Sequence, residues 1–222
     1  MNGFYKISEW IMRFSVVNVI WLLFNLPIVV LVINMFKTNE WLTFSSFFIF
    51  IIVLAPFLFF PATAAMFACA RDWIMKRDGK SLWKEFWLHY KNNYKQSVIS
   101  GGLLTVIWTI WVVDMYFFHD VNTVMMLIFL IMGLFLFVYT VNFFSVVVHY
   151  NMALKLLIIN TFLITVGSPI IFFVVLISSV LIFYANLYAP LFIMVFFSGT
   201  LYAFVNFSSF YRVYTKLNNK ST

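Results

Sequence analysis

The side chains that can serve in catalysis or metal binding are few and widely separated in this chain of 222 residues. The three histidines, His89, His119 and His149, match no metal-ligand spacing. The single cysteine, Cys69, excludes an intramolecular disulfide and every metal motif that needs several cysteines. The sequence also has no glycine-rich phosphate loop, nucleophile elbow or paired-carboxylate motif. It therefore predicts no catalytic residue, no cofactor or metal site, and a protein that is not an enzyme.

Polar residues inside the long apolar runs are uncharged, whereas ion-coupled transporters usually place ionisable groups there. Asp114 is the nearest exception, and we interpret it as a solvated carboxylate near the end of a run. The uncharged residues are Asn18, Asn25, Asn142, Ser145 and Asn206. Because asparagine in lipid usually bonds to a neighbouring helix, we interpret this set as inter-helix contacts. The alternative is that it lines a substrate cavity.

The composition indicates a protein whose surface is surrounded mainly by lipid. Of its residues 64% are hydrophobic and 9% charged, with a mean hydropathy of +1.01, whereas a soluble domain averages about 25% charged residues. The net charge of +7 would suit a nucleic-acid partner, but the basic residues cluster in short segments between uncharged runs. That pattern is typical of membrane topology, and we expect no nucleic-acid binding.

The lengths of the apolar runs predict an all-α, polytopic transmembrane helical bundle, since about 20 apolar residues cross the hydrocarbon core. A single transmembrane domain, 1–222, would contain about six spans. Breaks at Gly167–Pro169 and Asn186–Pro190 divide the last long run, because proline disfavours a continuous helix. The predicted spans are 14–36, 42–69, 97–117, 122–148, 168–185 and 190–211.

The distribution of Lys and Arg predicts the topology. With a cytoplasmic N-terminus and six spans, all fourteen basic residues except Lys37 lie on the cytoplasmic side. If 152–166 also crossed, the basic C-terminus would be exported, which the positive-inside rule disfavours. We therefore expect a multi-pass protein of the bacterial plasma membrane with both termini in the cytoplasm. The segment 152–166 would be an in-plane helix or continuous with span five.

The polar segment 81–96 predicts a basic amphipathic helix with an aromatic face. Aromatic side chains recur three and four residues apart, at Trp83, Phe86, Trp87 and Tyr90, while Lys84, Lys91 and Lys95 occupy other faces. Such helices lie in the headgroup region, so this one is interpreted as a surface elbow that leads into span three. The alternative is a docking helix for a partner protein.

A stretch of small residues marks the end of the second predicted span. Pro61, Ala64, Ala65 and Ala68 would let helix backbones approach closely, because association in lipid depends on packing and polar contacts. We interpret them as a helix-packing seam.

Three stretches together resemble the YesL-like family of bacterial membrane proteins: Asn18–Pro27, Pro61–Phe67 and the helix containing Phe86 and Tyr90–Ser97. Family members resemble accessory proteins of carbohydrate ABC importers. The resemblance therefore implies a non-enzymatic accessory role, with the permease subunits of an importer and the lipid bilayer as partners. It implies no catalytic residue. A small transporter or channel is the alternative function, since Pro27 and Pro56 can break helices and broken helices build midplane sites.

The charge count predicts the result of labelling intact cells with an impermeant thiol reagent. Cysteines introduced at Lys37 or Asn122 should react, whereas cysteines at Lys80 or Lys216 should not. Labelling at Lys216 from outside would mean that an odd number of helices crosses the membrane.

Overall fold

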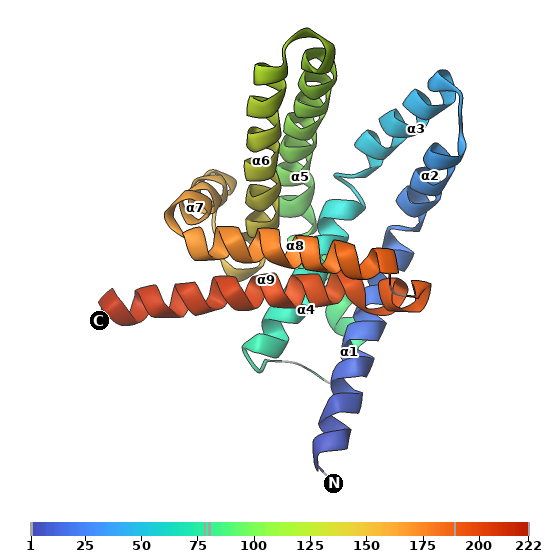
Figure 1. Cartoon of the computed structure of the whole chain (residues 1–222). Helices are drawn as coiled ribbons and strands as arrows, with labels where there is room; N and C mark the ends of the chain where they lie inside the picture. The colour runs from blue at the N-terminus through green and yellow to red at the C-terminus, as the bar shows by residue number, and fades with distance from the viewer. Residues whose placement is uncertain (1, 78, 80, 189, 222) are drawn as a thin grey trace.

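The computed structural model describes residues 2–77, 79, 81–188 and 190–221, and all the regular structure among them is helical (Figure 1). The helices are α1 (Asn2–Phe24), α2 (Leu26–Lys37), α3 (Trp41–Leu54), α4 (Phe59–Ile74), α5 (Leu82–Val121), α6 (Thr123–His149), α7 (Leu154–Gly167), α8 (Pro169–Tyr188) and α9 (Leu191–Ser221). Within the described residues, five helices are long and apolar enough to cross a membrane, or six if the bent pair α3–α4 is one span. The prediction of a polytopic helical bundle is confirmed.

The first predicted span, 14–36, is two helices in the structure. α1 ends at Phe24, and α2 begins at Leu26 with Pro27 in its first turn. Proline has no N–H and its ring collides with the preceding turn, so one straight helix cannot continue through it. The pattern of apolar residues gives no sign of this break because apolar residues continue on both sides of it.

The second predicted span, 42–69, is bent for the same reason. α3 and α4 meet at an angle of 52° across a four-residue break that contains Pro56. The backbone recovers part of its hydrogen bonding through Leu58 N–H, which donates to Leu54 C=O, and Phe60 N–H, which donates to Ala55 C=O. α3 and α4 therefore remain one connected but angled unit.

The predicted elbow between 81–96 and the third span is absent. α5 runs without interruption for 40 residues, from Leu82 to Val121. No proline lies within this stretch, and its glycine pair Gly101–Gly102 is tolerated inside the helix. The aromatic segment is therefore the first half of a long helix rather than a separate in-plane helix.

The other boundaries differ less from the predictions. Asn122 caps α6, and its side-chain oxygen accepts from the N–H groups of Val124 and Met125. The segment predicted as an in-plane helix, 152–166, forms α7, which packs against α6 and α8. The last two predicted spans correspond to α8 and to a longer α9.

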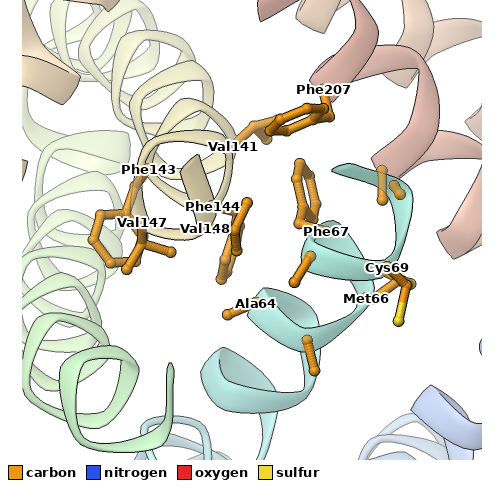
Figure 2. Close-up of a cluster of buried hydrophobic side chains, with 14 of the residues drawn as sticks. Ala64, Met66, Phe67, Cys69, Val141, Phe143, Phe144, Val147, Val148 and Phe207 are labelled. Carbon is orange, nitrogen blue, oxygen red and sulfur yellow. The ribbon is translucent and has the colours of Figure 1, made fainter. Parts of the chain in front are cut away.

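The core of the molecule surrounds α4, which packs against α1, α5, α6 and α9. Every residue of α4 from Phe60 to Ala70 is buried. Figure 2 shows Phe67 of α4 between Phe144 of α6 and Phe207 of α9, and the rings of Phe67 and Phe144 lie 5.5 Å apart. α4, which is rich in small residues, thus occupies the centre, and aromatic rings of α6 and α9 pack against it.

Three of the five uncharged polar residues bond across helix interfaces. Asn18 of α1 donates to Val195 C=O of α9 at 2.6 Å and accepts from Thr200 N–H at 2.9 Å. Asn142 of α6 donates to the Thr165 hydroxyl of α7 at 3.0 Å. The third is Asn206 of α9, which accepts a bond of 3.3 Å from the Ser178 hydroxyl of α8. These contacts match the inter-helix interpretation.

Asn18→Leu should destabilise the fold, because it leaves Val195 C=O and Thr200 N–H without their side-chain partner. A buried polar group left without its partner costs about 1–3 kcal/mol, so the midpoint of thermal unfolding in detergent should fall by several degrees. Asn34→Leu is the matched control, since Asn34 is exposed and its amide donates within its own helix to Val30 C=O. Equal midpoints for the two variants would contradict this assignment.

Candidate functional site

Part of the aromatic face predicted on 81–96 packs against other helices of the protein. Phe86 is fully buried, and its ring lies 5.3 Å from that of Phe24 at the end of α1. Tyr90 approaches the same ring at 4.7 Å. Phe24 thus inserts among the aromatic side chains of α5, and this face contributes to the packing of the protein's own fold.

The remaining residues of the predicted docking set lie on the surface. Trp83 is 52% exposed and Trp87 43% exposed. The lysines Lys84, Lys91 and Lys95 are all exposed, and the ammonium of Lys91 lies 5.0 Å above the Trp87 ring. The structure therefore divides the set into an inner pair, Phe86 and Tyr90, and an outer basic and aromatic surface.

Tyr90 also stabilises the break between α3 and α4. Its hydroxyl donates to Phe57 C=O at 3.3 Å, a carbonyl that lies between the two helices. Lipid offers no hydrogen bond to such a carbonyl, so a side chain or water has to supply it. One residue of α5 thus contacts α1 at Phe24 and the α3–α4 break at Phe57.

The small residues of the predicted seam, Pro61, Ala64, Ala65 and Ala68, are all buried in α4. A Cβ added to Gly101 of α5 would meet the Phe60 ring at 2.5 Å. This glycine is therefore needed for α5 to approach α4 closely.

A buried charge cluster links the end of α4 to α5. Asp72 lies 2.7 Å from the guanidinium of Arg71 and 2.8 Å from Nε2 of His89. Asp72 and His89 are each only 9% exposed. The Arg71 guanidinium also donates to Val148 C=O in the last turn of α6, where a cation interacts favourably with the helix dipole. The cluster thus fixes the ends of three helices relative to one another.

Aromatic rings surround His149 at the end of α6. Its ring lies 4.5 Å from that of Tyr214, 4.8 Å from Tyr150 and 5.4 Å from Phe210. These three aromatic residues also line a cavity of about 380 Å³ between α7, α8 and α9. A second hollow, of about 220 Å³, is an open groove between α3–α4 and α5–α6.

The side chains that line the two hollows are suited to packing and to binding. Among the described residues that line either hollow, the ionisable side chains are the tyrosines Tyr150 and Tyr214. Among the residues that the structure describes, no group of three or more His, Cys, Asp and Glu side chains is placed to hold a metal ion.

Sequence reasoning missed the charge cluster and the role of Phe24. Asp72 and His89 are separated by a polar loop, and no motif connects them. The available signal was Asp72 itself, a carboxylate directly after a long apolar run. Phe24 gave no signal, since it is one of 30 phenylalanines in the chain.

Phe86→Ala and Trp83→Ala should differ strongly in stability. Removing the buried Phe86 ring leaves a cavity beside Phe24 and should lower the free energy of unfolding by about 3–5 kcal/mol. Trp83→Ala, at an exposed position of the same helix, should change it by about 0.5 kcal/mol. Denaturant unfolding in detergent micelles measures both. If Phe86→Ala left stability unchanged, the inward packing of this face would be wrong.

Comparison with known proteins identifies relatives along most of the chain. Residues 14–115 match the family described as "Protein of unknown function, DUF624". The chain is 29% identical over 216 residues to the uncharacterized protein YteU of Bacillus subtilis, covering 96% of this chain and 85% of YteU. It is 23% identical over 205 residues to the uncharacterized protein YesL of the same organism, covering 92% of this chain and 86% of YesL. No solved structure matches the chain.

The family match includes all three stretches on which the resemblance was based, Asn18–Pro27, Pro61–Phe67 and the α5 segment with Phe86 and Tyr90–Ser97. The similarity to YteU and YesL also extends over the C-terminal half, which contains none of these stretches. These findings confirm the predicted resemblance of this chain to the YesL-like family of uncharacterised membrane proteins.

Proposed function

We propose that this protein is a non-catalytic accessory subunit that binds the transmembrane helices of a partner in the membrane. The observation that carries the proposal is the apolar groove between α3–α4 and α5–α6. Its lining comes from both sides: Phe48, Ile51, Ile52, Ala55, Phe59, Phe60, Thr105, Trp108, Thr109, Val112 and Thr140.

The polar atoms of this groove are already engaged within the protein. The hydroxyls of Thr105 and Thr109 donate to carbonyls one turn earlier in α5. Trp108 donates its indole N–H to the Thr140 hydroxyl at 3.1 Å. The groove therefore presents methyl groups and rings to its surroundings, which suits the apolar side chains of another helix and offers nothing to a polar solute.

The arm formed by α2 and α3 contributes one wall of the groove. Neither helix contains a buried residue, and Figure 1 shows the two as a hairpin that extends away from α4. At the start of α3, the Trp41 ring lies 6.2 Å from that of Tyr116 on α5. A partner helix in the groove would bury part of both the arm and α5, which favours van der Waals association in lipid.

The partner in this proposal is the permease of a carbohydrate ABC importer. This part rests on the resemblance to the YesL-like family, whose members resemble accessory proteins of such importers. The cytoplasmic location of both termini belongs to the same proposal and rests on the distribution of Lys and Arg.

A small transporter is the second candidate, and the two broken helices favour it. The breaks at Asn25 and at Ala55–Leu58 lie on either side of Tyr90, which contacts Phe24 and Phe57. The side-chain oxygen of Asn25 is buried and has no hydrogen-bond partner among the described residues. Discontinuous helices with free polar groups form substrate sites in many transporters.

Filling the groove tests the accessory function. Thr109→Phe places a ring in the groove, whereas Val106→Phe places the same ring at an exposed position of α5 that does not line it. Affinity purification from native membranes in a mild detergent should recover importer permease subunits with the wild type and with Val106→Phe. Recovery with Thr109→Phe should fall by roughly tenfold, which corresponds to a loss of about 1.4 kcal/mol.

Equal recovery of the permease with both variants would contradict the groove as the binding surface. A monomer free of other proteins, together with solute flux into liposomes that exceeds that of empty vesicles, would favour the transporter instead. Quantifying each variant in the membrane fraction separates lost binding from lost protein.

A further inference from the structure

The cavity between α7, α8 and α9 has the features of a ligand site. Its volume of about 380 Å³ lies within the range of about 300–1,000 Å³ that is typical of small-molecule pockets. Gly167 and Ser168, at the corner where α7 ends and α8 begins, form one side. The full lining is Tyr150, Asn160, Leu163, Ile164, Gly167, Ser168, Ile171, Phe210, Val213, Tyr214 and Leu217.

Four polar side chains in this lining retain hydrogen-bonding capacity. The hydroxyls of Tyr150, Ser168 and Tyr214 make no hydrogen bond to any group that the structure describes. Asn160 donates only to the Met152 sulfur, at 3.1 Å, and sulfur is a weak acceptor. These side chains are half-buried and can donate to or accept from an occupant, which would be stabilised by those hydrogen bonds.

The remaining lining is apolar and aromatic, and it carries no charge. The rings of Tyr150 and Tyr214 lie 5.8 Å apart, and Phe210 lies 6.4 Å from each of them. Burial and the nearby Tyr214 raise the pKa of the Tyr150 hydroxyl, so it remains a neutral donor. The lining side chains themselves offer hydrogen bonds rather than charges, which matches a hydroxyl-bearing headgroup.

The cavity lies close to the charged residues at the end of α9. Arg212 and Lys216 flank Val213 and Tyr214 in the sequence and are exposed, and tyrosines and basic residues mark the headgroup region of a membrane. Leu217, which also lines the cavity, is 63% exposed. The polar part of an amphiphile can thus enter at headgroup depth while its tail stays in the surrounding lipid.

We propose that this cavity binds a neutral amphiphile, whose uncharged hydroxyl-bearing head contacts Asn160, Ser168 and the two tyrosines. A glycerolipid and a glycolipid share this chemistry. The site is distinct from the groove of the accessory function and is a binding activity in addition to it.

The test uses the full chain in phosphatidylcholine nanodiscs with a photoactivatable diacylglycerol. After illumination, mass spectrometry should locate crosslinks on α7, α8 and α9 at the cavity. Excess unlabelled diacylglycerol or octyl glucoside should reduce labelling about tenfold, and the stronger competitor identifies the class of lipid. Free glucose should compete much less, because it lacks a tail, and phosphatidic acid should compete no better than diacylglycerol, because the lining itself offers its charge no partner.

Gly167→Leu provides a variant that fills the cavity without a steric conflict. A Cβ at Gly167 meets no atom within 4 Å, and the glycine has no positive φ. Gly102→Leu is the matched control, since a Cβ there also meets open space and Gly102 does not line the cavity. Labelling should fall about tenfold in Gly167→Leu and remain at the wild-type level in Gly102→Leu. Thermal unfolding confirms that both variants fold.

Ser168→Ala separates recognition of the head from recognition of the tail. It should weaken competition by diacylglycerol severalfold without changing the volume available to the tail. Equal labelling of the two glycine variants, crosslinks away from the cavity, or stronger competition by phosphatidic acid would each overturn the proposal.

Discussion

The close approach of neighbouring helices to α4 is the interaction on which the rest of the structure depends. Lipid tails are as apolar as leucine, so burying apolar side chains gives helices in a membrane little reason to associate. Helix association therefore depends on close van der Waals packing and on a few hydrogen bonds. The alanines of α4 and the absent side chain at Gly101 allow that contact, and Phe67, Phe144 and Phe207 complete it. α6 and α8 expose many apolar side chains, and the close packing around α4 holds them in the bundle.

The second constraint is that each interruption of a helix has to be repaired locally. Pro27 and Pro56 divide what the hydropathy treats as continuous spans, and each break frees backbone groups. At the first break the Asn25 side chain donates to Trp21 C=O, and at the second the Tyr90 hydroxyl donates to Phe57 C=O. The first of these bonds is local, whereas the second comes from a distant part of the sequence. Tyr90 also contacts Phe24 of α1, so the same side chain joins α5 to both broken segments.

The sequence was sufficient for properties that depend on composition and on long runs. It predicted the helical class and the approximate ends of α6 and α8, and it identified Asn18, Asn142 and Asn206 as residues that join helices. The sequence was insufficient for features that depend on which helix surfaces pack against one another. The spacing of Phe86 and Tyr90 showed an aromatic face but could not show that Phe24 packs against it. The Asp72–His89 contact joins residues across a loop, and no local pattern encodes such a pair. The prediction of an elbow before span three was wrong. An amphipathic pattern shows which faces of a helix are polar and apolar, but it does not show whether the helix continues straight into the next segment.

The uninterrupted length of α5 has a consequence for the shape of the bilayer around the protein. Forty residues at about 1.5 Å each make a rod of about 60 Å, twice the hydrocarbon thickness of about 30 Å. The lysines lie in its first half, so that half projects toward water. Phe24 and Phe57 contact this same half through Tyr90, so both helix breaks lie against the lysine-bearing half of α5. From these lengths we expect a shorter hydrophobic belt on this face than beside α6, to which annular lipids would adapt by compressing.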